Sequence, residues 1–476
     1  MEALKQSLEG AGRRSAEANA LSGDAVKSAE TVLPGGTIHP AKQALKRALA
    51  DARKRYARAN PLSRNADKFA EKHLPGGNTR AVLHFDPYPL TLVKGEGAEV
   101  VDLDGHRYVD FVGEYSAGLF GHSDETIKQA IHEALDVGTG MGAPTAYERA
   151  LAGLLCMRFA SLEKVRFCNS GTEANLMAIA TAVAHTGRKK ILVFNGSYHG
   201  GVINFPSGGS ILNAPYDFLL ADYNDVQGTA ALICKHADKL AAVLVEPILG
   251  AGGNIPATYA FLKMLRRETR KAGILLIFDE VKTARLGPAG MQGLRRITPD
   301  LMSLGKFVGG GLPTGVFGGR TRVMKHFNPK RPDFWNHAGT FNNNVCSMAA
   351  GCVGLGKVYT QERAAEFYEW SEAFRLSLNE LFSAMDVPMY ANGLGSIIAI
   401  HFSRKVTMVP SDITPGCQSL RPLLHMEMLL EGVLICKRGD LFLSLPMTDT
   451  HLSKVRLAFE KFIDRHKSLI EDVLAA

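Results

Sequence analysis

Short apolar runs alternate with amphipathic helical stretches along the middle of the chain, from about residue 115 to about residue 345. Each apolar run is too short to be a helix, and a short run of this kind favours a strand. The runs occupy residues 191–194, 242–245, 274–278, 301–304 and 315–317. Strands that alternate with helices are typical of a mostly parallel sheet with helices on both faces. The pattern therefore predicts an α/β fold around a central sheet.

The segments on either side of this region have a different pattern. The chain up to about residue 60 looks helical, and two β-rich runs that flank Asp104-Gly105 predict a hairpin. Further elements are expected after residue 345: a long helical region, a strand, a helix and a final strand, at residues 347–382, 397–402, 420–430 and 441–445. We therefore expect a helical N-terminal extension (1–60), a large domain (116–345), and a smaller α+β domain built from residues 61–115 and 346–476.

Composition and charge narrow the classes of function. The 476 residues are 46% hydrophobic and 21% charged, without the run of about 18 apolar residues that a membrane span needs. The net charge of +8 is spread along the chain with no aromatic-interleaved basic motif, so we expect no nucleic-acid partner. The seven cysteines form no C-x-x-C pair, and the N-terminus lacks the apolar core of a secretory signal. These features predict a cytoplasmic protein with reduced thiols.

Polar residues repeatedly follow the predicted strands. Tyr198, Glu246, Asp279 and Lys306 each lie at a strand's end or a few residues beyond it. In such sheets, ligands bind at the carboxyl ends of the strands. A lysine there can form a Schiff base with an aldehyde, and a carboxylate can keep a pyridine nitrogen protonated. Lys306 and Asp279 together therefore favour pyridoxal 5'-phosphate (PLP) chemistry over a surface lysine and a helix cap or buried ion pair.

A predicted helix N-terminus supplies a candidate phosphate site. Ser170, Gly171 and Thr172 precede the helical run at residues 176–184. Small and hydroxyl residues at such a position present free backbone N–H groups and the positive end of the helix dipole. The same residues also suit an ordinary N-cap. The presence of Lys306 and Asp279 elsewhere in the chain favours the phosphate site.

Six motifs stand in the order and spacing of a known enzyme family. They are Ser170-Gly171-Thr172-Glu173-Ala174, Tyr198-His199-Gly200, Val245-Glu246-Pro247, Phe278-Asp279-Glu280-Val281, Gly305-Lys306-x-x-Gly309-Gly310-Gly311 and Ala338-Gly339-Thr340. On these motifs the chain resembles the class III, fold-type I PLP-dependent aminotransferases over roughly residues 60–470. Within that class it looks most like the glutamate-1-semialdehyde aminomutase-like group. Within the group it resembles the β-amino acid (β-phenylalanine) aminotransferases.

The resemblance implies a role for each residue around the cofactor ring. Lys306 would carry the cofactor as an internal aldimine and, once released by substrate, move a proton between the substrate carbon and the cofactor. Asp279 would pair with the pyridine nitrogen, while Tyr198 and Val281 would lie on the two faces of the ring. Glu246 would lie near the cofactor's 3-hydroxyl, although a structural hydrogen bond fits this residue equally well.

The resemblance also assigns residues to the cofactor phosphate. Gly171 and Thr172 would hold it, with Ser170 beside them. Thr340 would reach the phosphate of a neighbouring subunit, which implies a homodimer with shared active sites. His199 is interpreted as a packing residue.

Two arginines are candidates for binding substrate carboxylates. An aminotransferase binds a carboxylate of each substrate in one site, and the planar fork of arginine suits that group. Arg80 and Arg438 lie in segments that resemble the carboxylate-binding segments of the β-amino acid aminotransferases. A solvated surface position is the alternative for each, and it fits Arg438 as well as the functional role does. Lys282 stands where methionine is common in the family, and no consequence is assigned to it.

The sequence therefore predicts an aminotransferase that moves an amino group from an amine or amino acid, plausibly a β-amino acid, to a keto acid through a pyridoxamine form. An aminomutase or amino-acid racemase that uses the same lysine is one alternative. The apolar run 175–182 and the segment 341–345 both depart from the aminomutase pattern. A catalytically inactive PLP-binding regulatory protein is the other alternative. Such proteins usually lose the lysine or the aspartate, and this chain has both Lys306 and Asp279.

Overall fold

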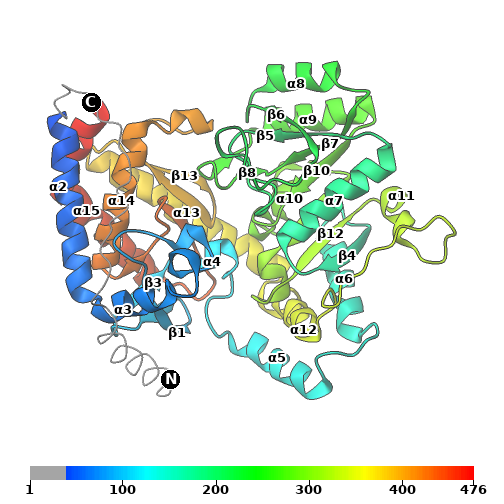
Figure 1. The fold of residues 1–476 in the computed structure, drawn as a ribbon, viewed down its shortest axis with the longest axis horizontal. Coiled ribbons are helices and arrows are strands. Elements are labelled where there is room, and N and C mark those ends of the chain that lie inside the picture. Colours follow the sequence, from blue (N-terminus) through cyan, green and yellow to red (C-terminus); the bar gives the residue numbers. More distant parts are fainter. Residues whose placement is uncertain (1–38) are drawn as a thin grey trace.

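The computed structural model describes residues 39–476. Within the predicted N-terminal extension it shows helix α2 (Pro40–Ala59), and the rest of that prediction, residues 1–38, lies outside the described residues. Pro40 stands in the first turn, where its missing N–H costs nothing. The buried face of α2 packs against α14 (Pro415–Leu430) and α15 (Asp449–Ala475), which lie beside it in Figure 1. The start of the described chain is therefore held by its C-terminal helices.

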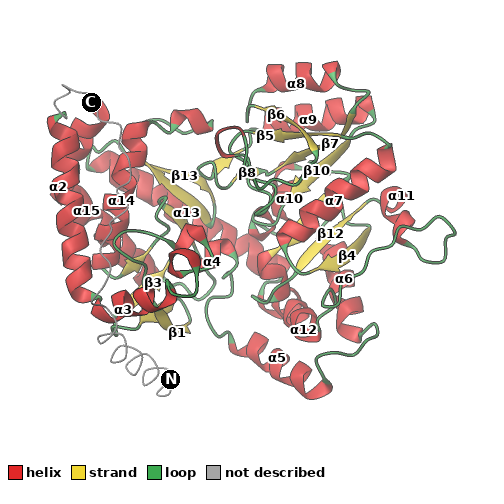
Figure 2. Ribbon diagram, in the orientation of Figure 1, coloured by secondary structure: helices red, strands yellow, loops and turns green. Residues whose placement is uncertain are grey.

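The central sheet has seven strands in the order β4-β12-β11-β10-β7-β5-β6. Figure 2 shows its strands as yellow arrows among red helices. In chain order they are β4 (Lys164–Cys168), β5 (Lys190–Phe194), β6 (Asp217–Ala221), β7 (Leu240–Val245), β10 (Leu275–Asp279), β11 (Leu301–Gly305) and β12 (Gly315–Gly319). Neighbours from β11 to β6 are parallel, whereas β12 runs antiparallel to both β11 and β4. The predicted mostly parallel sheet is confirmed, with its five predicted strands.

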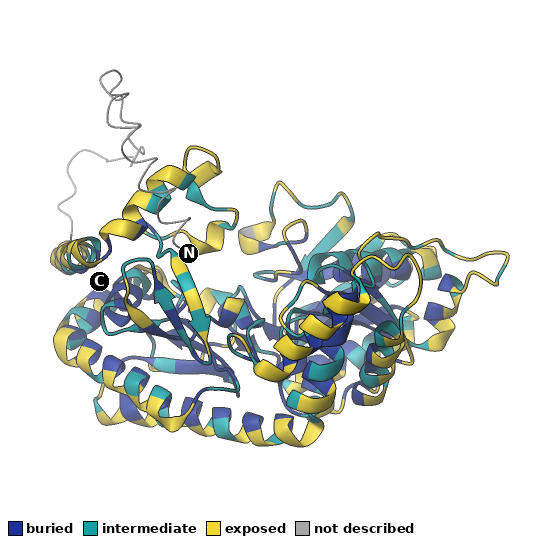
Figure 3. Ribbon diagram, turned by 90° about the horizontal axis from the view of Figure 1, so that it is seen from below, coloured by how far each residue is buried: buried dark blue, intermediate teal, exposed yellow. Residues whose placement is uncertain are grey.

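Helices cover both faces of this sheet. α7 (Gly171–Thr186) shares a buried cluster with Leu244 of β7, whereas α9 (Tyr259–Ala272) shares another with the preceding residue, Val243. Successive strand residues point to opposite faces, so the two helices lie on opposite sides of the sheet. The middle strands are buried on both faces, which explains their continuous apolar sequences. Figure 3 shows buried strands between helices with exposed outer faces.

A second group of elements comes from both ends of the chain. The predicted hairpin forms from β2 (Glu99–Asp102) and β3 (Arg107–Asp110), which pair antiparallel. β1 (Leu92–Glu96) extends the hairpin on one side, and β15 (Val433–Leu434) pairs parallel to β3 on the other. Segments more than three hundred residues apart therefore share one sheet, of order β1-β2-β3-β15.

The C-terminal segment contains more elements than its pattern predicts. The long helical region is two helices, α12 (Val345–Val353) and α13 (Gln361–Ala384), separated by a π-helical turn over Gly354–Val358. The side chain of Thr360 caps α13, so a new helix begins there. A three-stranded sheet follows, made of β13 (Tyr390–Leu394), β14 (Ile397–His401) and β16 (Asp440–Phe442). The terminal helix α15 was not predicted.

The remaining elements connect or flank these sheets. They are α3 (Pro61–Ala70), α4 (Gly113–Ser116), α5 (Glu125–Val137), α6 (Ala146–Arg158), α8 (Val226–Lys235), β8 (Ile248–Leu249), β9 (Ile255–Pro256), α10 (Gly290–Arg295) and α11 (Thr321–Met324). Residues 39–476 also contain seven short turns of 3-10 helix besides the π-helical turn at Gly354–Val358. No helix within residues 39–476 is long and apolar enough to cross a membrane. β7, β10 and β11 are parallel neighbours, so their carboxyl ends lie side by side and form the edge that carries the candidate site.

Candidate active site

The adjacent strands β10 and β11 bring Asp279 and Lys306 to one edge of the sheet. Asp279 is the last residue of β10 and pairs in register with Ser303 of β11, and Lys306 follows the end of β11 directly. The backbone of Lys306 is left-handed, with a φ of 56°. That conformation costs a non-glycine residue about 1–2 kcal/mol, so the surrounding structure must hold the lysine in place.

Lys306 is partly buried, and its surroundings favour the uncharged amine. Burial is the main cause that lowers the pKa of the amine, and the charges of Arg80 and Arg285 lower it further. Asp279 and Glu246 act in the opposite direction without reversing the shift. A lysine with a lowered pKa presents more free amine near neutral pH, which is the form that attacks a carbonyl or accepts a proton.

The carboxylate of Asp279 is buried and held on both oxygens. One oxygen contacts Asn175 Nδ2 at 2.8 Å and His199 Nδ1 at 2.7 Å. The other accepts from the backbone N–H of Val281 at 3.1 Å. The interpretation of His199 as a packing residue is therefore incomplete, because its ring orients Asp279. The sequence analysis did not identify Asn175 as a site residue. Its amide, at the start of the otherwise apolar run on α7, could have indicated a buried polar contact.

Glu246 follows β7 and fixes the loop that carries Tyr198. Its carboxylate accepts from the backbone N–H of Tyr198 at 2.8 Å and from that of Gly250 at 3.0 Å. Burial raises the pKa of the Glu246 carboxyl, and Asp279 raises it further. These bonds favour the structural hydrogen-bonding role for Glu246. Tyr198 remains 46% exposed, so its ring is accessible to a ligand.

The N-terminus of α7 forms a closely packed cradle. Ser170 is its N-cap, with its hydroxyl accepting from the N–H of Glu173 at 3.2 Å. A Cβ on Gly171 would lie 2.7 Å from Val281 Cγ1, and a Cβ on Gly200 would lie 2.3 Å from the hydroxyl of Thr172. Backbone N–H groups in the first turn have no intrahelical acceptor, so this cradle suits a phosphate. The N-cap and phosphate interpretations of Ser170 are compatible.

Thr340 lies in a loop that contacts the residue before Ser170, because Asn169 Nδ2 donates to Asn342 Oδ1 at 3.1 Å. It is exposed, in the loop between α11 and α12. Its predicted contact with a neighbouring subunit stays a prediction.

The two candidate carboxylate-binding arginines lie around Tyr115. Arg80 forms an ion pair with Glu114, and its guanidinium carbon lies 5.3 Å from the ring centroid of Tyr115. Arg438 contacts the buried Asp440 at 3.0 Å, and this carboxylate raises the pKa of Arg438. Both guanidiniums lower the pKa of the Tyr115 phenol against the larger effect of burial, which raises it. Each arginine is thus close to Tyr115 and already paired with a carboxylate of the chain.

A second amine, Lys282, belongs to the same region. Its ammonium donates to Asn254 Oδ1, lies 4.7 Å from the ring centroid of Phe442, and has its pKa lowered to about 8, mainly by burial. Asn254 in turn donates to Asp440 at 3.2 Å. Lys282 is therefore joined through Asn254 to the carboxylate that holds Arg438. The sequence assigned no role to it.

Comparisons with known proteins agree with this geometry. The family model described as aminotransferase class-III matches residues 84–463. The β-phenylalanine transaminase of Variovorax paradoxus is 45% identical over 393 residues, which are 83% of this chain and 90% of that protein. A crystal structure of a β-phenylalanine aminotransferase from the same organism has a TM-score of 0.88 at 44% identity, covering 89% of this chain and 99% of that one.

Two more distant relatives bear on the chemistry. A glutamate-1-semialdehyde 2,1-aminomutase of Staphylococcus epidermidis is 34% identical over 403 residues, covering 81% of this chain and 94% of that protein. A solved structure described as a transaminase with PLP bound has a TM-score of 0.79 at 29% identity, covering 87% of this chain and 98% of that one.

Proposed function

The chain belongs to the class III aminotransferases and is a PLP-dependent transaminase, and from that premise we propose that its amino donor is a β-amino acid and its acceptor a keto acid. The observation that carries the proposal is the placement of Arg80. Its charge acts on the pKa of the Lys306 amine, so a carboxylate bound by Arg80 would hold the rest of the donor near that amine. The 45% identity to a β-phenylalanine transaminase supports this donor class.

The residues around Lys306 and Asp279 fit the cofactor. When bound, PLP accepts the amino group and draws electrons from the substrate carbon. The buried Asp279 carboxylate can keep a proton on a ring nitrogen, and Asn175 and His199 hold that carboxylate in one orientation. The cradle at Gly171 can take the phosphate, since the helix N-terminus offers N–H donors and a positive dipole end.

We assign the proton transfers at the substrate carbon to Lys306. A general base works best when its pKa lies near the operating pH, and burial moves the pKa of the Lys306 amine in that direction. We also assign the two faces of the cofactor ring to Tyr198 and Val281. We assign Glu246 the role of holding the Tyr198 backbone by its hydrogen bond rather than of touching substrate.

The carboxylate subsites have a further property. Arg80 is paired with Glu114, and Arg438 is paired with Asp440. A substrate carboxylate must therefore either share the guanidinium with that acidic side chain or displace the side chain from it. Arg80 is the more accessible of the two, with 41% of its side chain exposed against 33% for Arg438. We therefore propose that Arg80 binds the donor carboxylate and that Arg438 contributes to the second carboxylate subsite.

A donor screen tests the proposal. The purified enzyme is supplied with β-phenylalanine, α-amino acids and simple amines, each with 2-oxoglutarate or pyruvate, and the amino acid formed from the acceptor is measured. We expect turnover with the β-amino acid. Arg80→Ala should lower kcat/KM for carboxylate donors by about tenfold to a hundredfold and spare simple amines, because only the former lose a charge-assisted bond.

Arg363→Ala is the matched control, because Arg363 is an exposed arginine on α13 whose ion pair is with Glu366. Unchanged activity of Arg80→Ala toward β-amino acids, or no transfer from any β-amino acid, contradicts the proposal. A requirement for the keto acid separates a transaminase from an aminomutase, which needs no acceptor. Turnover with any donor also argues against an inactive regulatory protein.

We also propose a cytoplasmic homodimer with the domain division given above. The exposed Thr340 and its neighbour Phe341, 67% exposed, support a contact with a second copy, and the seven free thiols support a reducing compartment. Analytical ultracentrifugation gives the mass. Mixing inactive Lys306→Ala and Thr340→Ala chains should restore some activity if the sites are shared, because one mixed site then has both native residues.

A further inference from the structure

A cationic cavity lies at the amino ends of the parallel strands β10 and β11, whereas the candidate active site lies at their carboxyl ends. Its volume is about 510 Å³, and it is lined by the first residue of β10, Leu275, and by residues next to the start of β11 and the end of β12. Its charged lining consists of four arginines and two carboxylates, namely Arg266, Arg270, Arg320, Arg322, Glu163 and Asp300. The lining therefore carries a surplus of positive charge.

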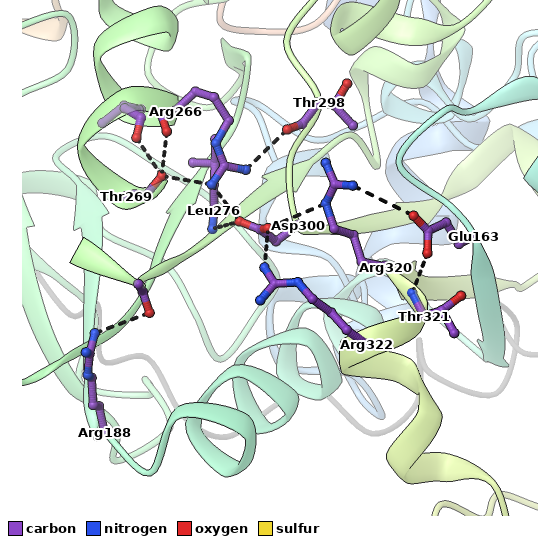
Figure 4. A network of polar contacts seen from close by, with 12 residues as sticks. Glu163, Arg188, Arg266, Thr269, Leu276, Thr298, Asp300, Arg320, Thr321 and Arg322 are labelled. Carbon is purple, nitrogen blue, oxygen red and sulfur yellow. Dashed lines mark hydrogen bonds and ion pairs between the residues drawn. The ribbon is translucent and has the colours of Figure 1, made fainter. Parts of the chain in front are cut away.

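One buried carboxylate gathers three of these arginines. Asp300, 4% exposed, contacts Arg266 at 2.8 Å, Arg322 at 3.0 Å and Arg320 at 3.7 Å (Figure 4). It also accepts from the backbone N–H of Leu276 at 3.1 Å. A single carboxylate neutralises only one of three guanidiniums. The charges of Arg320 and Arg322 are therefore left over, and these side chains, 32% and 59% exposed, are accessible to a further anion.

The second carboxylate does not remove the surplus. Glu163 lies 3.7 Å from Arg320 and accepts from the backbone N–H of Thr321 at 2.7 Å. Arg270, on the last turn of α9, adds a fourth guanidinium and takes part in no side-chain hydrogen bond or ion pair within the described residues. Two guanidiniums thus remain without a compensating carboxylate in the lining.

Two buried polar atoms of the lining also lack partners. Arg266 Nε and His185 Nδ1 are buried and make no hydrogen bond within residues 39–476. Arg266 is otherwise fixed, because it donates to the carbonyl oxygen of Thr298 at 3.2 Å and to Thr269 Oγ1 at 3.3 Å. Both atoms are covered by the chain itself, so the feature that an anion in the cavity can use is the fixed position of the Arg266 guanidinium.

We propose that this cavity binds a small phosphate-bearing anion with at least two negative charges. Guanidinium groups bind phosphate oxygens through paired N–H donors, and the cavity has the size of an ordinary small-molecule site. The site is separate from the cofactor cradle. The five residues of β11 lie between Asp300 in the cavity and Lys306 in the candidate active site, and they span about 16 Å. An anion in the cavity therefore does not touch Lys306.

Isothermal titration calorimetry tests this with pyrophosphate as the probe. The protein is used as the PLP-loaded enzyme after excess cofactor is removed, so the cradle at Gly171 is already filled. We expect saturable binding of one pyrophosphate per chain. Arg270→Glu should weaken the affinity by about tenfold or more, because it replaces a charge-assisted donor with a repelling charge.

Arg267→Glu is the matched control, because it makes the same change of charge on the same helix at an exposed residue outside the cavity. Its affinity for pyrophosphate should stay within about twofold of the wild type. Absence of saturable binding to the wild type overturns the proposal. Equal weakening by both variants also overturns it, because the effect is then one of overall charge.

Arg322→Ala is a second test variant. It removes one guanidinium and leaves Asp300 in contact with Arg266 and Arg320. We expect it to weaken pyrophosphate binding by about threefold to tenfold. An unchanged affinity in both Arg270→Glu and Arg322→Ala places the anion elsewhere and contradicts the proposal. The result does not depend on the donor specificity, because binding is measured without an amino donor.

Discussion

Two lysines lie near the carboxyl ends of the central strands, and their partners distinguish them. Burial lowers the pKa of both amines. Lys306 has Asp279 and Glu246 close by but forms no hydrogen bond or ion pair with either within the described chain, so its amine is available for reaction. Lys282 is tied to Asn254 Oδ1 and lies over the ring of Phe442. Hydrogen bonding and packing therefore favour Lys306 over Lys282 for the proposed covalent role.

Lys282 has a predicted effect on stability. Lys282→Met removes a buried ammonium, whose desolvation is the main cause of its lowered pKa. We expect the variant to be more stable than the wild type by about 1–3 kcal/mol near pH 7. Chemical denaturation of both proteins, loaded with cofactor, measures the difference.

The sign of the pH dependence follows from the pKa. The folded-state pKa is about 8 and the ordinary value is 10.5. Between these two values the unfolded lysine holds a proton that the folded one lacks, so stability rises with pH. The advantage of Lys282→Met should therefore shrink as the pH is raised from about 8 to about 10. An advantage that grows over this range contradicts the lowered pKa.

At the scale of single elements, the N-terminus of α7 forms the cradle and packs closely against Val281, which follows β10. Gly171→Ala places a Cβ 2.7 Å from Val281 Cγ1 and must displace either the helix end or Val281, which lies two residues beyond β10. We expect a PLP affinity lower by about tenfold, since such overpacking costs about 1–3 kcal/mol. Titration of the apoprotein with PLP measures it.

Gly153→Ala on α6 is the control for this prediction. Gly153 is exposed, and a Cβ there meets no atom within 4 Å. Alanine should leave the PLP affinity unchanged and stabilise the helix slightly, because glycine is a poor helix former. If Gly171→Ala binds PLP as tightly as Gly153→Ala, the close packing of the cradle is not needed for the cofactor.

The sequence predicted the strands that are buried on both faces, because a continuous apolar run is a strong local signal. β4 (Lys164–Cys168) and β6 (Asp217–Ala221) were missed because their charged and partly exposed residues break that signal. The break between α12 and α13 depends on a single capping residue, Thr360, inside a region of helical periodicity. Element boundaries of this kind are set by local hydrogen bonds that the apolar pattern does not encode.

The site was predictable where a residue lies in a motif at a strand end, as Lys306 and Asp279 do. The partners that orient them were not. Asn175 and His199 meet Asp279 only after α7 and the loop beyond β5 fold against β10. Glu114 next to Arg80 is likewise a contact between residues far apart in the sequence. Such long-range pairs require the fold to be known.

At the scale of the whole molecule, Arg285 connects the large sheet to the second group of elements. It is fully buried just after β10, and its guanidinium donates to Ser396 Oγ at 3.1 Å, to the carbonyl oxygen of Ser116 at 3.0 Å, and to that of Leu443. Burial lowers the pKa of Arg285 to about 10. The Arg285 side chain therefore holds the segments that contain Ser116, Ser396 and Leu443 next to the carboxyl end of β10.

Arg285→Met should destabilise the protein by about 3 kcal/mol or more, because it leaves buried acceptors without donors. Urea unfolding of the variant and the wild type measures the loss. The exposed Arg363→Met is the control and should change stability by less than about 0.5 kcal/mol. Equal effects of the two substitutions would show that the buried connection contributes nothing.

The identity of the lysine that bonds to the cofactor tests the central claim most directly. The PLP-loaded enzyme is treated with borohydride, which fixes the cofactor to the amine that holds it, then digested and mapped by mass spectrometry. The arrangement of Lys306 beside Asp279 predicts that the label is found on Lys306 and is lost from Lys306→Ala. Label on Lys282, or undiminished labelling of Lys306→Ala, would contradict the account.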